Sequence, residues 1–139
     1  MSRICKVLIV EDHEGVRDLL GEVLDQEGFE FKAVESGAEM RAALDEDDYD
    51  IAVIDVSQPS QEDGFALAEA AREAGCSVIL ITGDHRYAER LQQSGNHHLL
   101  KPFRVSDFLT LVERVLAEAA NLCVRRKRGD GSFFPLRPE

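Results

Sequence analysis

The sequence lacks an apolar stretch of the roughly 18 residues that a membrane span requires. It also lacks a signal-peptide layout, because residues 1–4 lead directly into a predicted strand. Cysteine is scarce, and Cys5, Cys76 and Cys123 are far apart, without metal-binding spacing. An odd, scattered set of cysteines favours free thiols in a reducing compartment. We therefore expect a cytoplasmic protein without membrane insertion, in which Cys5 and Cys76, at strand starts, are inert.

Basic residues are scarce outside the C-terminal part of the chain. The net charge of the 139 residues is −11, while residues 125–128 form a basic cluster. An acidic body argues against broad nucleic-acid binding. We expect one domain at residues 1–121 and a basic, aromatic tail at residues 122–139 that is extended or disordered and too short for a DNA-binding module. Alternatively, the tail is a docking peptide that orders against an acidic partner or against this domain's own face.

Short apolar runs with one polar end organise the rest of the sequence. Four such runs lead into Glu11 and Asp12, into Asp55, into Thr82 and into Lys101. Runs rich in Val and Ile are typical of strands buried on both faces of a parallel sheet. Parallel strands end at the same edge, where ligands bind in open α/β sheets. These five side chains are therefore expected to share one pocket, although each of them alone would suit a solvated loop.

Apolar residues recur at helical spacing between the predicted strands. Strands are predicted near residues 5–10, 29–33, 51–54, 77–81 and 97–100, with helices near 14–26, 37–44, 64–75, 85–93 and 106–121. The helix at 85–93 is short and polar. Strict alternation of strand and helix predicts an α/β fold of (βα)5 type, a doubly wound parallel sheet with helices on both faces.

Three carboxylates at one sheet edge require a cation to offset their repulsion. Mg²⁺ suits oxygen ligands, and no Cys or His stands at these strand ends to favour zinc. His13 follows Asp12, but a single histidine that opens a loop is more often exposed than a ligand. A carboxylate can also act as a nucleophile and form an acyl phosphate. Lys101 and Thr82 offer a charge and a hydroxyl to phosphoryl oxygens. The absence of a general base fits transfer from an activated phosphodonor.

The order and spacing of these motifs resemble the receiver domain of two-component response regulators. The matching pieces are residues 7–12, Ile54-Asp55-Val56 with Pro59 and Asp63-Gly64 downstream, residues 79–83 and Lys101-Pro102-Phe103. The resemblance extends from residue 4 to about residue 121. It implies a flavodoxin-like sheet with strand order 2-1-3-4-5.

The resemblance also implies roles for individual residues. Asp55 would be phosphorylated by a histidine kinase or histidine phosphotransfer protein. Asp12 would bind Mg²⁺ directly, Glu11 through water and Ser57 through its backbone carbonyl. Thr82 and Lys101 would hold the phosphoryl group, and the Lys101–Pro102 bond would be cis.

His98 stands where the family places an aromatic switch residue. One interpretation is a switch that turns inward as Thr82 moves toward the phosphoryl group. The other is a strand histidine with a local hydrogen bond. Ser57 and Asp84 stand where the family tunes loss of the phosphoryl group.

Two segments depart from the family pattern. The loop after Asp55 is one residue longer than usual, which shifts Asp63-Gly64. The stretch from Thr82 to Lys101 is shorter than is common, so a short or irregular helix is expected there.

The sequence is therefore interpreted as a single-domain response regulator, an Mg²⁺-dependent phosphoacceptor and not a turnover enzyme, that switches a surface for an unknown downstream protein. The alternative is a receiver-like interaction module that works without phosphorylation. A flavodoxin is disfavoured because the acidic loop at residues 11–14 would repel phosphate. An aspartate-nucleophile phosphatase is disfavoured because Ser57 stands where a second acid is usual.

Overall fold

The predicted apolar runs form one five-stranded parallel sheet. Its strands are β2 (Lys6–Val10), β3 (Glu30–Val34), β4 (Ile51–Asp55), β5 (Ser77–Thr82) and β6 (His97–Leu100). They lie in the order β3-β2-β4-β5-β6, and every neighbouring pair is parallel. This arrangement confirms the predicted α/β fold and the 2-1-3-4-5 order. The structure, a computed structural model, describes residues 3–57, 63–119, 123–126 and 133–134.

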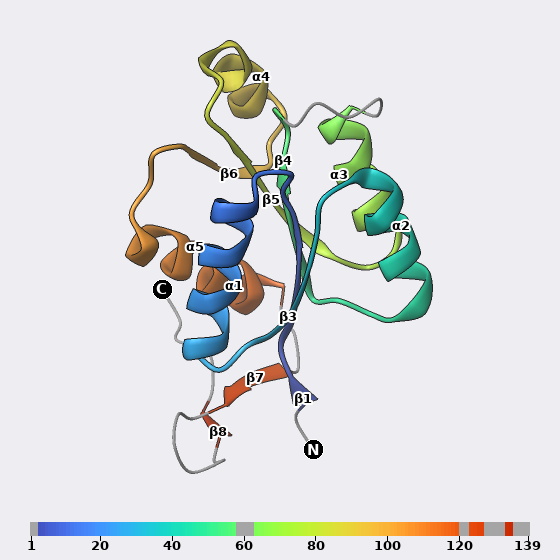
Figure 1. Cartoon of the computed structure of the whole chain (residues 1–139), viewed down its shortest axis with the longest axis vertical. Coiled ribbons are helices and arrows are strands. Elements are labelled where there is room, and N and C mark those ends of the chain that lie inside the picture. The colour runs from blue at the N-terminus through green and yellow to red at the C-terminus, as the bar shows by residue number, and fades with distance from the viewer. Residues whose placement is uncertain (1–2, 58–62, 120–122, 127–132, 135–139) are drawn as a thin grey trace.

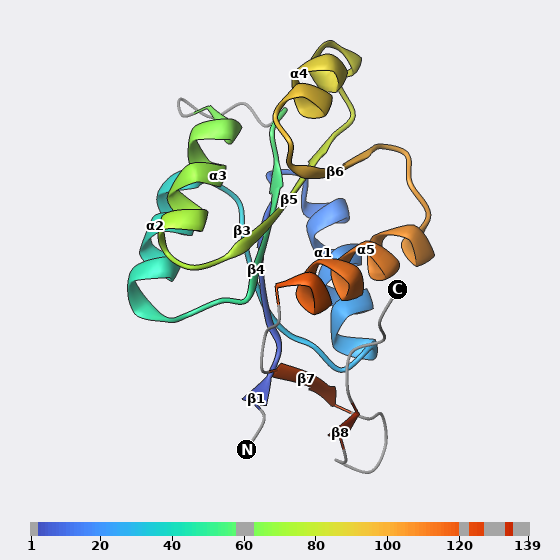
Figure 2. The ribbon, with the colours of Figure 1, turned by 180° about the vertical axis from the view of Figure 1, so that it is seen from behind.

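Helices cover both faces of this sheet (Figures 1 and 2). They are α1 (Glu14–Gln26), α2 (Gly37–Glu46), α3 (Gly64–Glu73), the 3-10 turn η1 (His85–Tyr87), α4 (Ala88–Gln93) and α5 (Val105–Glu118). Side chains of α1 and α5 pack with one face of the strands in one apolar core. Side chains of α2 and α3 pack with the other face in a second core. Strands buried on both faces are continuously apolar, as residues 51–54 of β4 are.

The register of the strands places their polar ends at one edge. Asp55 is the last residue of β4 and pairs with Ile81, so Thr82 lies one position further along the adjacent strand. The Lys101 amide donates to the Thr82 carbonyl at 2.8 Å, which brings the end of β6 to the same edge. The Lys101–Pro102 bond is cis, as the family resemblance implied.

The segment between β5 and β6 is short and irregular, as expected. After η1, helix α4 has only 6 residues. Its Arg90 donates to Asp63 at 2.9 Å and lies 3.9 Å from the ring centroid of Phe65. These contacts attach α4 to the start of α3. The two departures from the family pattern, the shifted Asp63 and the shortened helix, therefore meet in space.

A second, smaller sheet lies at the end of the molecule opposite α4 (Figures 1 and 2). It contains β1 (Arg3–Ile4), β7 (Cys123–Arg126) and β8 (Phe133–Phe134), in the order β1-β7-β8. In the segment 122–139, for which an extended or disordered tail was expected, β7 pairs with the N-terminal strand. This pairing agrees with the alternative expectation that the segment orders against the domain's own face. The remainder of that segment, and Pro59, lie outside the described residues.

The cysteine prediction requires a correction. Cys5 and Cys123 form a disulfide, and only Cys76, which is buried, is a free thiol in the described part of the chain. The sequence did not indicate this bond, because the two cysteines are 118 residues apart and come together only when β1 pairs with β7. Within the described ranges, no helix combines the length and apolar character needed to cross a bilayer.

Candidate functional site

Three carboxylates converge at the carboxyl edge of the central sheet. Glu11, Asp12 and Asp55 each offer an oxygen within 4.8 Å of the other two. Glu11 and Asp55 are buried, at 0% and 2% exposure, whereas Asp12 is exposed. The carboxylate of Glu11 also accepts the His13 amide at 3.1 Å, which fixes the turn after β2. The site therefore has two enclosed carboxylates and one that faces solvent.

Lys101 lies between the two buried carboxylates. Its Nζ is 2.8 Å from Glu11 Oε1 and 2.9 Å from Asp55 Oδ2. Burial disfavours its charged form, but the hydrogen bonds that the ammonium donates to Glu11 and Asp55 outweigh this effect and raise the pKa of Lys101. The ammonium therefore remains charged and compensates part of the negative charge of the pocket.

The two buried carboxylates differ in their protonation. Burial raises the pKa of Glu11 to about 7, although the Lys101 ammonium acts in the opposite direction. Burial also opposes ionisation of Asp55, but hydrogen bonds from Ser57 and Lys101 outweigh it and lower the pKa of Asp55. The negative charge is therefore held preferentially on Asp55.

Ser57 contacts Asp55 in a way that the sequence reasoning did not include. Its hydroxyl donates to Asp55 Oδ1 at 2.6 Å, and its amide donates to the same oxygen at 2.8 Å. The family resemblance implied a metal-binding backbone carbonyl for Ser57 and a position that tunes loss of the phosphoryl group, but no contact with Asp55. Asp55 itself was the available signal for the amide contact, since an aspartate carboxylate commonly accepts the backbone amide two residues further along the chain.

The remaining predicted residues make contacts outside the group of Glu11, Asp55 and Lys101. Thr82 is fully buried, and its hydroxyl accepts the Asp84 amide at 3.0 Å. The Asp84 carboxylate binds Arg86, and this hydrogen bond lowers the pKa of Asp84 to about 2. His98 is half-buried, and its Nδ1 is 3.2 Å from the Asn96 carbonyl. That contact is the local hydrogen bond of the non-switch interpretation, and the switch role stays a prediction.

Arg17 is a supporting residue that the sequence reasoning missed. Its Nη1 donates to the Glu11 carbonyl at 3.0 Å and to the Asp12 carbonyl at 3.3 Å. The same group lies 3.8 Å from the Glu35 carboxylate. Arg17 stands on α1, directly after the acidic turn, and therefore braces the backbone that carries two of the three carboxylates.

With this geometry described, comparison with known proteins identifies the family. The family model described as the response regulator receiver domain matches residues 7–113. The chain belongs to the response regulator receiver family. Receiver domains are signalling modules and not turnover enzymes, and phosphorylation and Mg²⁺ binding at an acidic pocket are typical of them. They interact with histidine kinases or phosphotransfer proteins.

Relatives of known sequence include longer regulators. The transcriptional regulatory protein GltR of Pseudomonas aeruginosa is 32% identical over 126 residues, which cover 86% of this chain and 52% of GltR. The aerobic respiration control protein ArcA of Escherichia coli is 28% identical over 120 residues, which cover 84% of this chain and 50% of ArcA. The chain thus spans about half the length of these curated relatives.

Solved receiver structures share the fold. A response regulator receiver protein from Sinorhizobium medicae superposes with a TM-score of 0.77 at 25% identity, covering 84% of this chain and 97% of that one. A CheY-like receiver domain protein from Methanospirillum hungatei gives a TM-score of 0.75 at 24% identity, with coverage of 84% and 97%. The latter similarity supports the fold alone.

The Arg17 contacts lead to a prediction about metal affinity. Arg17→Ala is expected to weaken Mg²⁺ binding to the receiver roughly tenfold, because residues that orient metal ligands typically contribute at this scale. Isothermal titration calorimetry would measure the change. Arg72→Ala is the matched control, since Arg72 pairs with Glu69 within α3. Equal Mg²⁺ dissociation constants for the wild type and Arg17→Ala would contradict the bracing role.

The raised pKa of Glu11 predicts a pH dependence of stability in the metal-free receiver. Between its ordinary value of 4.5 and the folded value of about 7, Glu11 is protonated in the fold and ionised in the unfolded chain. The free energy of unfolding should therefore fall as the pH rises through this window, by at most about 3 kcal/mol. The lowered pKa of Asp55 affects stability in the opposite direction. Its contribution to the free energy of unfolding is lost only as the pH falls below the ordinary pKa of 3.8.

Urea unfolding in a metal chelator at pH 5 and pH 8 would test this dependence. Glu11→Gln should remove most of the decrease, because the amide does not titrate. Mg²⁺ should stabilise the wild type more at pH 8 than at pH 5, since the metal competes with the proton. An unchanged pH dependence in Glu11→Gln would assign the effect to other groups.

Proposed function

We propose that this receiver accepts a phosphoryl group on Asp55 from a phosphohistidine of a histidine kinase or histidine phosphotransfer protein, with Mg²⁺ as cofactor. The observation that carries the proposal is the environment of Asp55. This carboxylate has a lowered pKa, stands at the edge of the sheet and contacts the Lys101 ammonium at 2.9 Å. An ionised carboxylate beside a cation is equipped to attack phosphorus.

The donor set supports Mg²⁺. Glu11, Asp12 and Asp55 supply only carboxylate oxygens, and the exposed Asp12 leaves part of the site open to water. Mg²⁺ prefers such oxygen ligands and retains several waters. The Ser57 carbonyl is proposed as a further ligand. When bound, the metal would supply charge neutralisation between the carboxylates and the incoming phosphoryl group.

The other residues of the pocket have proposed roles in the transfer. The bond from phosphorus to the imidazole nitrogen breaks as the bond to an Asp55 oxygen forms, and the leaving imidazole takes a proton from solvent. Lys101 exchanges its contact with Asp55 for a phosphoryl oxygen. Thr82, whose hydroxyl already accepts one hydrogen bond, donates a hydrogen bond to another phosphoryl oxygen.

The proposed biological setting follows from this chemistry. Phosphorylation would change a protein-binding surface recognised by an unidentified downstream protein, in a cytoplasmic phosphorelay. We propose no direct DNA contact by this chain, in keeping with its acidic charge of −11.

Intact mass spectrometry would test the proposal directly. After incubation with acetyl phosphate and Mg²⁺, the wild type should gain one phosphoryl group, and omission of Mg²⁺ should abolish the gain. Asp55→Asn should not be modified, whereas the exposed Asp48→Asn should behave like the wild type. A phosphoryl adduct on Asp55→Asn would identify a different acceptor. No adduct on the wild type, with Mg²⁺ binding intact, would favour a receiver-like interaction module.

A further inference from the structure

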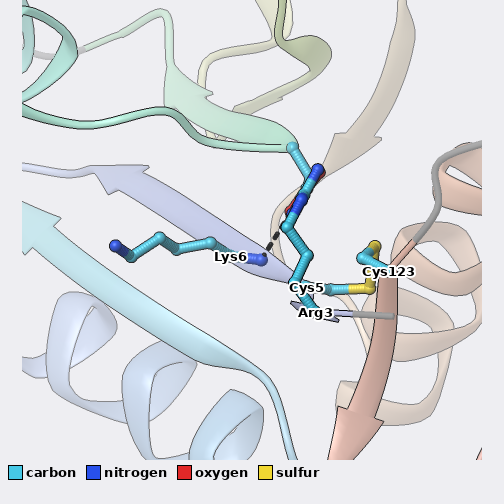
Figure 3. Close-up of a disulfide and its surroundings, with 5 residues drawn as sticks. Arg3, Cys5, Lys6 and Cys123 are labelled. Atoms are coloured by element: carbon cyan, nitrogen blue, oxygen red, sulfur yellow. Dashed lines mark hydrogen bonds and ion pairs between the residues drawn. A yellow bond between two sulfur atoms is a disulfide. The ribbon is translucent and has the colours of Figure 1, made fainter. Parts of the chain in front are cut away.

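A disulfide joins the two ends of the described chain at the amino edge of the central sheet. Cys5 stands between β1 and β2, and Cys123 is the first residue of β7. Figure 3 shows this bond beside Arg3 and Lys6. Both cysteines are buried, at 0% and 5% exposure, within the core beneath α1 and α5. The bond therefore fastens β7 to the domain.

Noncovalent contacts hold β7 in the same place. The Cys5 amide donates to the Val124 carbonyl at 2.7 Å, and the Arg126 amide donates to the Gly28 carbonyl at 2.6 Å. These bonds attach β7 to β1 on one side and to the turn after α1 on the other. If the disulfide opens, they keep the two thiols near each other, so the bond can form again without a search by a free tail.

A buried arginine adds a second attachment. Arg125 is only 3% exposed, and its Nη1 lies 2.9 Å from Glu113 of α5 and 3.8 Å from Glu27 at the end of α1. The strand is thus connected through charge to both helices that cover this face of the sheet. A change in the attachment of β7 is therefore expected to alter its ion pairs with α1 and α5.

The third cysteine is separated from this pair. Cys76 belongs to the core on the opposite face of the sheet. Burial raises the pKa of Cys76 to about 11, and its two potential partners are bonded to each other in the core on the other face. Formation and opening of a disulfide within the chain are therefore confined to Cys5 and Cys123, which gives a defined pair of states. Cys5 and Cys123 both lie outside residues 7–113, which the family model matches, so the disulfide is not part of the matched receiver region.

We propose that Cys5 and Cys123 form a reversible redox site that controls how tightly β7 is latched onto α1 and α5. The co-reactant is a thiol or dithiol reductant of the glutathione or thioredoxin class. A dithiol gives two electrons and two protons to the disulfide, leaving two protein thiols and its own disulfide. In the oxidised state β7 is fixed. In the reduced state only its hydrogen bonds and ion pairs hold it, and it opens more often. This inference does not depend on phosphoryl transfer to Asp55.

Thiol counting on the full-length native chain tests the reversibility. The protein is equilibrated in buffers of graded glutathione to glutathione disulfide ratio, quenched in acid, unfolded and alkylated, and its mass is measured. Alkylated cysteines should change from one to three in a single step and return on reoxidation. Three alkylated cysteines at every ratio, or a single one even after native treatment with dithiothreitol, would overturn the proposal, as would glutathione attached to Cys76.

Hydrogen exchange tests whether the disulfide controls the attachment of β7. Reduction should speed exchange of the Cys5 and Arg126 amides roughly tenfold, and leave the amides of β4 unchanged. Cys123→Ser should reproduce the reduced state without reductant, and Cys76→Ser should behave like the wild type. Glu113→Gln should affect β7 exchange mainly in the reduced protein, where the ion pair is one of the remaining attachments. Equal exchange of β7 in both redox states would refute the latch.

Discussion

Lys101→Met is expected to slow phosphorylation of the receiver by acetyl phosphate at least roughly 100-fold, while Mg²⁺ binding is retained or strengthened. The loss is of the size seen when one preorganised donor to a transition-state oxygen is removed. The metal should not be lost, because the Lys101 ammonium contacts Glu11 and Asp55 at 2.8 and 2.9 Å and so competes with a dication for them. Intact mass against time and calorimetric titration with Mg²⁺ would measure the two effects.

The opposite behaviour of rate and affinity separates a role in transfer from a structural role. Lys32→Met is a suitable control, since Lys32 is a surface lysine on β3 that lies 3.7 Å from Glu46. It should leave both quantities unchanged. If Lys101→Met lost Mg²⁺ affinity and phosphorylation in parallel, the residue would serve to hold the pocket together. Lys101→Arg, which keeps the charge with a different shape, should retain part of the rate.

Gly28→Ala is expected to destabilise the oxidised protein by roughly 2–5 kcal/mol, from left-handed strain and overpacking together. Gly28 has a φ of +86°, and an added Cβ would lie 1.9 Å from the Arg126 carbonyl oxygen. The backbone of β7 must therefore move away, which breaks the bond from the Arg126 amide to the Gly28 carbonyl. Urea unfolding would measure the loss of stability.

Gly75→Ala provides the matched control. Gly75 also has a positive φ, of +96°, but an added Cβ meets nothing within 4 Å. It should lose only the backbone term of about 1–2 kcal/mol. Hydrogen exchange should show faster opening of β7 in Gly28→Ala alone. If the two variants lost the same stability, β7 would contribute little to holding this end of the domain.

The sequence alone was sufficient for the central sheet and for the composition of the pocket. Runs such as residues 51–54 are apolar throughout because both faces of a parallel strand are buried. This pattern can be recognised without knowing which strands and helices pack against the run. Parallel strands end at a common edge, so the polar residues after each run were expected to meet there. Contacts of Lys101 with Glu11 and Asp55 agree with that expectation. The strand order itself came from the family resemblance.

Sequence patterns were not sufficient to predict which partner a polar side chain selects in the folded protein. Arg17 stands on the predicted helix 14–26, and nothing in its spacing indicates that it donates to the Glu11 and Asp12 carbonyls. The hydroxyl of Ser57 was likewise available to solvent or to Asp55, and only the folded turn selects the carboxylate. The protonation of Glu11 also depended on folding, because its burial is a property of the packed pocket.

The amino edge of the sheet was decided by tertiary structure alone. The basic residues at 125–128 were expected to belong to an extended or disordered tail, yet Arg125 is buried against Glu113 and Glu27. Cys5 and Cys123 read as separate thiols, yet they are bonded. Disulfide partners and long-range ion pairs have no periodicity, and they depend on which segments the fold brings together. The sequence by itself therefore determined the sheet and the polar residues at its carboxyl edge, and the fold determined how the N-terminal segment and β7 are joined.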